Sequence, residues 1–246
     1  MTAGFWRFMC FCAVLGAGFW LVCFCPALEV KEIKVNGAQK ISQSDCVKKI
    51  EDEVNKKIAL FNSKSILLFN LEQTKKELLA QFPQIQNIKI ERQFPSKIFA
   101  SVEERRGVAI FNAQNGKNYL LDSDGVIFEE AGQNSDLLQI NSSSEPPANI
   151  GAQLVARDLL AAILEIRGDI QNSNGIFIKS AQIANAQRVN LQTNAGWYIY
   201  FNPLKDADEQ LSKLKAVLND ESFKQKADNL EYIDIRFTRV YLKEKN

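Results

Sequence analysis

The sequence predicts an α+β protein, with a single N-terminal membrane helix followed by two domains that contain strands and a few helices. Residues 8–25 form a run of 18 residues without a charge, close to the length that spans a bilayer core. Beyond this run, segments with apolar residues at every second position are mixed with segments whose apolar residues recur every three or four positions. These two patterns are typical of strands and amphipathic helices. The order of the segments is not the regular strand–helix alternation that predicts a parallel α/β sheet.

The apolar segment is predicted to be a transmembrane helix over residues 8–27, with residues 1–7 as a short cytoplasmic tail. Arg7 and the amino terminus are positive on the short side, and the positive-inside rule then exports the rest of the chain. A cleaved signal peptide is the main alternative, although Cys-Pro-Ala at 25–27 is a poor cleavage site. A lipoprotein signal is a weaker alternative, because a bulky residue precedes Cys23.

Composition excludes several classes of function. Lys and Arg total 30 against 29 for Asp and Glu, so the chain has no basic excess for binding a nucleic acid. The chain has no histidine, which excludes Ser-His, Cys-His and His-metal mechanisms. No glycine-rich phosphate loop or nucleophile elbow is present. We therefore expect no cofactor, no metal and no small-molecule substrate.

Residues 28–105 predict a small domain with the element order β-α-α-β-β. Its first helix places Cys46 on an apolar face, and this predicts a core residue and not a reactive thiol. Since Cys46 is the only cysteine beyond the apolar run, the domain has no disulfide framework. The predicted elements are a strand at 29–37, helices at 42–58 and 71–83, and strands around 85–90 and 98–102.

Residues 106–246 predict a second, β-rich domain with two helices. One helix is expected from residue 158 to about Gly168, and another over 206–220. The Pro-containing segment 140–152 predicts a loop. Strands are expected at 107–111, within 118–130, within 175–193, at 196–202 and at 232–246.

The hairpin predicted within 118–130 contains two acidic residues that invite a second interpretation. Asp124-Gly125 is a strong turn signal, because glycine and, less readily, aspartate tolerate a positive φ. Asp122 and Asp124 would also be the first candidates for a calcium or catalytic carboxylate site. The spacing does not match a calcium-binding loop, which needs its glycine at the sixth position. A structural turn is therefore the favoured interpretation.

The last segment, YIDIRFTRVYLKEKN, predicts a strand over 232–246 whose apolar residues change sides partway along. Ile233, Ile235 and Phe237 share one face, and Val240 and Leu242 share the other. The strand must therefore bulge near Thr238-Arg239 or exchange one buried face for another. We expect a break in the ladder there, with Ile233 and Ile235 buried and the segment beyond it more exposed.

Three stretches resemble the FtsQ/DivIB family of cell-division proteins: VKEIKVNGAQKIS, VEERRGVAIF followed by YLLDSDGVIF, and YIDIRFTRVYLK. The first domain resembles a POTRA (polypeptide-transport-associated) module, and the likeness in order and spacing covers nearly the whole chain. The chain differs from the family pattern in its short tail, in Gly107 where the family often has Pro, and in having only Thr238 between Phe237 and Arg239.

The resemblance implies a non-enzymatic bitopic scaffold at the division septum, anchored in the plasma membrane, with both domains outside the cytoplasm. It implies FtsB- and FtsL-type division proteins as partners, bound largely through the distal domain. A strand at a sheet edge can pair with a strand of a partner, which is β-augmentation. The side chains that we expect at such a surface are Tyr232, Arg236, Phe237, Arg239 and Tyr241.

Other interpretations remain open from the sequence. For each of the five terminal residues the alternative is structural, with the aromatic rings in the core and the arginines solvated. For the whole chain the alternatives are an envelope POTRA protein with another role, an exported enzyme whose carboxylate site is unrecognised, and a surface adhesin or sensor.

Overall fold

The computed structural model describes residues 3–55, 63–132, 136–144 and 147–245. The chain divides into two compact units, 1–105 and 106–246, and each is considered by itself.

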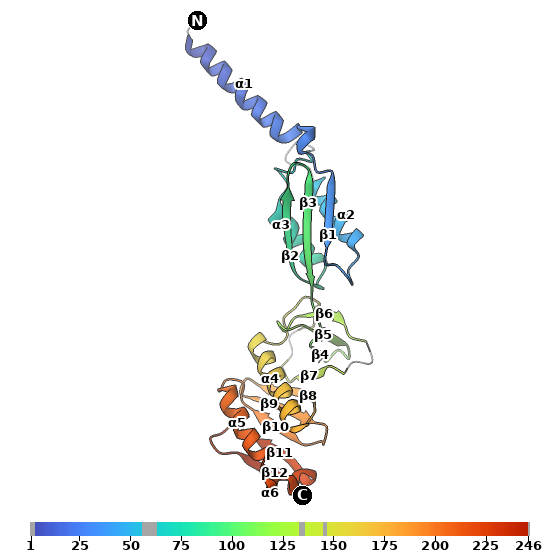
Figure 1. Cartoon of the computed structure of the whole chain (residues 1–246), viewed down its shortest axis with the longest axis vertical. Helices are drawn as coiled ribbons and strands as arrows, with labels where there is room; N and C mark the ends of the chain where they lie inside the picture. Colours follow the sequence, from blue (N-terminus) through green and yellow to red (C-terminus); the bar gives the residue numbers. More distant parts are fainter. Residues whose placement is uncertain (1–2, 56–62, 133–135, 145–146, 246) are drawn as a thin grey trace. The chain divides into compact units, whose positions relative to one another are not determined.

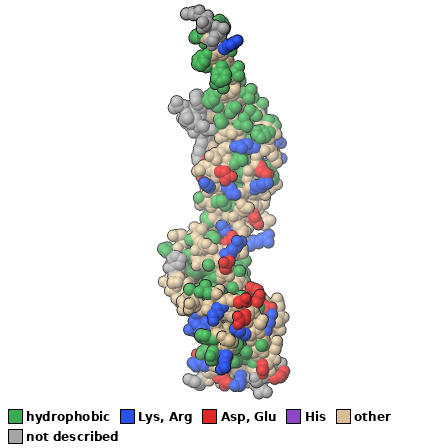
Figure 2. Space-filling view, turned by 90° about the vertical axis from the view of Figure 1, so that its left-hand side faces the viewer, with side chains coloured by type: hydrophobic (Ala, Val, Ile, Leu, Met, Phe, Trp, Pro, Cys, Tyr) green, Lys and Arg blue, Asp and Glu red, His purple; other side chains and the backbone are tan. Residues whose placement is uncertain are grey.

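The first unit begins with helix α1 (Ala3–Phe24), of which Phe5–Phe24 is long and apolar enough to cross a membrane. Figure 2 shows hydrophobic side chains covering this helix. The helix differs from the predicted span 8–27 at both ends: it begins within the predicted tail, and it ends before Pro26. Proline disfavours helical backbone at the preceding residue, and the chain continues as a short 3-10 turn, Pro26–Leu28.

The rest of the first unit confirms the predicted β-α-α-β-β order (Figure 1). The central strand of its sheet is β3, which pairs in parallel with β1 on one side and antiparallel with β2 on the other. Both helices pack on this sheet through apolar faces, and the part of the predicted first helix beyond residue 55 lies outside the described residues. The elements are β1 (Glu32–Asn36), α2 (Gln43–Val54), α3 (Leu71–Gln81), β2 (Ile85–Gln93) and β3 (Lys97–Glu104).

Cys46 lies in the core of this unit, as predicted, with no exposed surface. Burial raises the pKa of its thiol, which disfavours the reactive thiolate. A second feature was not predicted: the half-buried Glu104 carboxylate accepts hydrogen bonds from the backbone amides of Gln39, Lys40 and Ile41. Glu104 therefore fixes the turn that leads into α2.

The second unit is built on a nine-stranded sheet with the order β12-β11-β10-β9-β8-β7-β4-β5-β6 (Figure 1). Its strands are β4 (Ala109–Asn112), β5 (Asn118–Leu121), β6 (Ile127–Glu130), β7 (Leu138–Ser142), β8 (Ile178–Asn185), β9 (Arg188–Thr193), β10 (Tyr198–Phe201), β11 (Leu230–Asp234) and β12 (Tyr241–Glu244). Its helices are α4 (Arg157–Asn174), α5 (Ala207–Leu218) and the short α6 (Glu221–Lys226).

Two helical connections join parallel strands in this sheet. Helix α4 lies between the parallel pair β7 and β8, and α5 with α6 lies between the parallel pair β10 and β11. Buried residues of α4 and α5 join those of the sheet in one continuous core. Side chains alternate between the two sides along each strand. Residues such as Tyr198, Tyr200 and Asn190 therefore lie on the side of the sheet away from this core. The helices thus cover one side, and on the other side β9 and β10 present polar and aromatic residues.

Two sequence predictions for this unit are wrong. Helix α4 does not end near Gly168 but runs on to Asn174, and Gly175 then caps it in the left-handed conformation, with φ 67°. Ile170 extends the buried face that includes Ile163 and Ile166, and this packing outweighs the weak helix propensity of glycine. The predicted loop 140–152 begins instead with residues of strand β7, which pairs with β4 and β8 on its two sides.

Candidate protein-binding edge of the distal sheet

The terminal segment is not one strand with a bulge, as predicted, but two strands joined by a chain reversal. Strand β11 ends at Asp234, the chain bends through 236–239, and β12 returns antiparallel to β11. The predicted break in the ladder, the burial of Ile233 and Ile235 and the greater exposure beyond them are confirmed. The reversal explains the change of side, because Leu242 now lies opposite Ile233 and so belongs to the same side of the sheet.

Strand β12 forms one end of the distal sheet, and its outer backbone groups have no neighbouring strand in the described part of the chain. The amide of Lys245 donates to Asn229, next to β11, and the amide of Ile235 donates to Tyr200 of β10, at 2.8 and 3.0 Å. Since amide direction alternates along a strand, both bonds place the amides of Leu242 and Glu244 on the outer side of β12. These two amides are available to a further strand.

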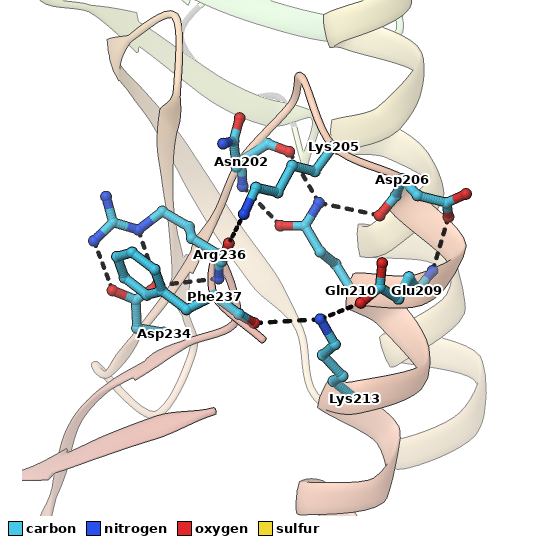
Figure 3. A network of polar contacts seen from close by, with 9 residues as sticks. All are labelled: Asn202, Lys205, Asp206, Glu209, Gln210, Lys213, Asp234, Arg236 and Phe237. Atoms are coloured by element: carbon cyan, nitrogen blue, oxygen red, sulfur yellow. Dashed lines mark hydrogen bonds and ion pairs between the residues drawn. The ribbon is translucent and has the colours of Figure 1, made fainter. Parts of the chain in front are cut away.

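The reversal is held by polar contacts with residues distant in the sequence (Figure 3). The Arg236 guanidinium donates to both carboxylate oxygens of Asp234, at 2.9 and 2.6 Å, and this pairing raises the pKa of Arg236. Lys205 donates through Nζ to the carbonyl of Arg236 at 2.8 Å, and Lys213 donates to the carbonyl of Phe237 at 3.2 Å. The loop before β12 is thus fixed by α5 and by the turn that precedes it.

The two sides of the sheet next to β12 differ in chemistry. On the side away from the helices, Tyr200 and Tyr232 stack with ring centroids 4.7 Å apart, and the Arg188 guanidinium lies 4.1 Å from the centroid of the Tyr200 ring. Phe237 and Tyr241 meet edge to face, with ring centroids 5.9 Å apart. This side therefore presents aromatic rings and cationic groups, a composition that is enriched at protein interfaces.

On the helical side, β12 borders a surface cavity of about 450 Å³. Its apolar wall includes Phe223 of α6 and Leu242 of β12, and the ion pair between Lys226 and Glu244, 2.8 Å in length, lies at its rim. Leu242 is 44% exposed, although it lies on the side of the sheet that faces the core elsewhere. An apolar side chain of a strand bound along β12 could enter this cavity.

The opposite end of the sheet, at β6, is covered by the chain itself. The amide of Ile127 donates to Ala152 at 3.0 Å, and the carbonyl of Ile127 accepts from Gly151 at 2.7 Å. An isolated antiparallel bridge pairs Val126 with Gln153. The start of β6 therefore has its outer backbone groups satisfied within the chain, in contrast to β12.

The five predicted partner-binding residues lie around the reversal but not on one strand. Tyr232 is half-buried on β11, Arg236 is paired with Asp234, and Phe237 and Tyr241 are 49% and 54% exposed. Arg239 is exposed and forms no hydrogen bond or ion pair with the residues that the structure describes. Their role in binding stays a prediction. The sequence placed Leu242 on the second apolar face of the terminal segment, but Phe223 and Arg188 were not predicted. Phe223 meets Leu242 only through the unpredicted α6 and β12.

Asp122 and Asp124, the alternative candidates for a carboxylate site, have structural partners. One carboxylate oxygen of Asp122 accepts from the amides of Asp124 and Val126, each at 2.9 Å, and Asp124 forms an ion pair with Arg157 at 2.8 Å. Asp122 is almost fully buried beneath the turn. Among the described residues, no group of three His, Cys, Asp or Glu side chains is placed to hold a metal ion.

Comparisons with known proteins agree with this architecture. Residues 28–105 match the model of the FtsQ-type POTRA domain, and residues 109–236 match the model of the C-terminal part of the cell-division protein FtsQ/DivIB. The second match ends at Arg236, where the reversal begins, and does not include β12.

The chain is also similar to a curated protein, the cell-division protein DivIB of Clostridium acetobutylicum, with 34% identity over 105 residues. The aligned region is 42% of this chain and 38% of the relative. Since the two family models together cover most of the chain in the order that its two units have, the chain belongs to the FtsQ/DivIB family of cell-division proteins.

Proposed function

We propose that this protein is a non-catalytic, single-pass membrane scaffold of the division machinery, which binds an FtsB/FtsL-type partner by β-augmentation at β12. In this proposal α1 crosses the plasma membrane with its amino terminus in the cytoplasm. Residues 28–105 and 106–246 then lie outside the cytoplasm, at the division septum. Family membership and the apolar helix support the membrane scaffold.

The observation that supports this binding site best is the open edge at β12. A strand edge without a neighbour exposes backbone donors and acceptors that favour pairing with another chain, and proteins usually cover or blunt such edges. This chain covers the β6 end with residues 151–153 but leaves the amides of Leu242 and Glu244 without a strand to pair with in the described part. We infer that β12 is open because a partner strand occupies it.

Side chains on both sides of β12 supply specificity in this proposal. Alternate residues of a bound strand would face the cavity beside Leu242 and, on the other side, the rings of Tyr241 and Phe237. The fixed reversal supports this geometry, because a preordered loop loses little conformational entropy on binding. Figure 3 shows the contacts that order it.

A proline substitution tests the backbone part of the proposal. Leu242→Pro removes an amide that points outward, so the ladder between β11 and β12 keeps its bonds while the partner loses one. We expect affinity for the FtsB-type partner of the same organism, measured with the full-length proteins in detergent, to fall about tenfold relative to Leu242→Ala.

Leu242→Ala is the matched control, because both variants lose the leucine side chain and only one loses the amide. Equal affinities of the two variants, with unchanged melting temperatures, would show that no partner strand pairs with β12. Removal of 232–246 is a poorer test, since this deletion also removes the buried side chains of β11.

A further inference from the structure

We propose that the end of the first domain nearest α1 rests on the bilayer surface, with Leu67 and Phe94 in the lipid interface and lysines against anionic headgroups. We define this membrane-proximal tip as residues 25–32, 63–69 and 92–98. The inference rests on the proposed membrane span of α1, but it is independent of the proposed binding edge at β12.

The chain itself keeps the tip next to the end of α1. The Ser63 hydroxyl donates to the carbonyl of Cys23, in the last turn of the helix, at 2.6 Å. The carbonyl of Leu28 accepts from the amide of Ile66 at 2.8 Å. Because only three residues separate Leu28 from Phe24, where the helix ends, the tip lies at the membrane boundary whenever α1 spans the bilayer.

The tip exposes two large apolar side chains in turns. Phe94, between β2 and β3, is 62% exposed, and Leu67, before α3, is 39% exposed. Arg92 joins these two turns, because its guanidinium donates to the carbonyls of Ile66 and Phe69 at 2.7 and 2.6 Å. The two apolar side chains thus come from turns that are fixed to each other, and apolar and aromatic side chains of this kind favour the headgroup boundary of a bilayer.

The charge of the tip also favours a lipid surface as what it binds. The tip has four basic residues and two acidic ones. Lys97 forms an ion pair with Glu32, whereas Lys31 and Lys64 are exposed and form no ion pair with any residue that the structure describes. Exposed lysines around apolar side chains are typical of surfaces that bind anionic lipid headgroups. A protein that binds the tip is the alternative, and the experiment separates it from lipid.

Photo-cross-linking of the full-length protein tests the proposal. Phe94 is replaced by the photo-reactive residue p-benzoylphenylalanine, and the protein is illuminated in its native membrane and in nanodiscs with and without anionic lipid. We expect lipid adducts on the peptide that contains residue 94, with a several-fold higher yield in the anionic nanodiscs. The double variant Lys31→Glu, Lys64→Glu is expected to remove this difference.

The same photo-reactive residue at Phe177, which is 50% exposed in the second unit, is the matched control and should give few lipid adducts. Equal lipid yields at 94 and 177 would overturn the proposal, and so would a discrete protein adduct at 94 in the native membrane without lipid adducts. Partner binding at β12 is measured separately, so failure of one proposal is distinguishable from failure of the other.

Discussion

Each end of the distal sheet has an edge strand whose outer backbone groups lack a neighbouring strand in the sheet, and the chain treats the two edges differently. At β6 the side chains of Ile127 and Phe128 are fully buried, and residues 151–153 pair with the outer backbone groups at the start of the strand. At β12, Tyr241 and Leu242 are about half exposed, and the described part of the chain provides no neighbouring strand.

The difference shows that an open edge in this protein is not forced by the fold. A free strand edge favours aggregation, and a short covering segment is sufficient to remove it, as at β6. The covered edge at β6 and the fixed loop beside β12, with Arg236 paired to Asp234, support our proposal that β12 offers its edge to a partner.

The largest effect is expected at the closed end. Gly125 has a φ of +74°, and a Cβ atom there would lie 1.9 Å from the carbonyl oxygen of Val155. Val155 continues the segment whose residues 151–153 cover the start of β6. Gly125→Val should lower the free energy of unfolding by about 3 kcal/mol or more, because it adds both strain and a backbone clash. Thermal unfolding measures the loss.

Gly116→Val is the matched control, because Gly116 has a similar φ of +79° but open space around its Cβ position. Its cost should be limited to strain, about 1–2 kcal/mol. If Gly125→Val is no more destabilising than Gly116→Val, residues 151–155 do not hold the β6 end closed as described.

A smaller effect is expected from loosening the reversal at the open end. Asp234→Ala removes the acceptor of the Arg236 guanidinium and leaves that cation half-buried without its partner, which should cost about 2 kcal/mol. Partner affinity should fall as well, because the loop before β12 is no longer preordered. Chemical unfolding and binding assays on the same variant measure both quantities.

Lys243→Ala on β12, which removes an exposed ion pair with Glu231 of β11, is the control and should leave stability unchanged within error. A loss of stability for Asp234→Ala without any loss of affinity would separate the reversal from partner binding and contradict the role that we assign to it.

The smallest effect is expected in the first unit, which serves as a reference for both ends. Burial alone would raise the pKa of Glu104, but the backbone amides of Ile41, Lys40 and Gln39 outweigh it, so the folded-state pKa is lowered. The carboxylate therefore stabilises this unit above its unfolded-state pKa, and the stabilisation is lost as the pH falls through the folded-state pKa.

Glu104→Gln should lower the stability of the first unit by about 1–2 kcal/mol at neutral pH and reduce its acid sensitivity, with affinity at β12 unchanged. Unfolding curves at several pH values measure both. An unaltered pH dependence would mean that Glu104 does not stabilise the turn at 39–41 through its charge.

The elements with strong local patterns could be predicted from the sequence. The β-α-α-β-β order, the buried Cys46 and the turn at Asp124-Gly125 all follow from periodicity and turn chemistry within short segments. The end of α4 could not be predicted from Gly168, because the buried Ile170 beyond it depends on tertiary packing.

The reversal before β12 shows most clearly what could not be predicted from the sequence. A bulge and a reversal produce the same change of phase between Phe237 and Val240, and the segment has no Gly or Pro to distinguish them. The contacts that decide the outcome come from Lys205 and Lys213, more than twenty residues away in the sequence. The open edge of the sheet is therefore β12 and not the single strand predicted over 232–246. The cavity beside Leu242 could not be predicted, because its lining comes from segments distant in the sequence.

Amide hydrogen exchange on the full-length protein tests the central claim most directly, with and without its FtsB-type partner. If a partner strand pairs with β12, the amides of Leu242 and Glu244 should exchange about tenfold more slowly in the complex or slower still, while the amide of Ile127 at the closed end keeps its rate. Unchanged exchange at Leu242 and Glu244 in a saturated complex would contradict β-augmentation at β12.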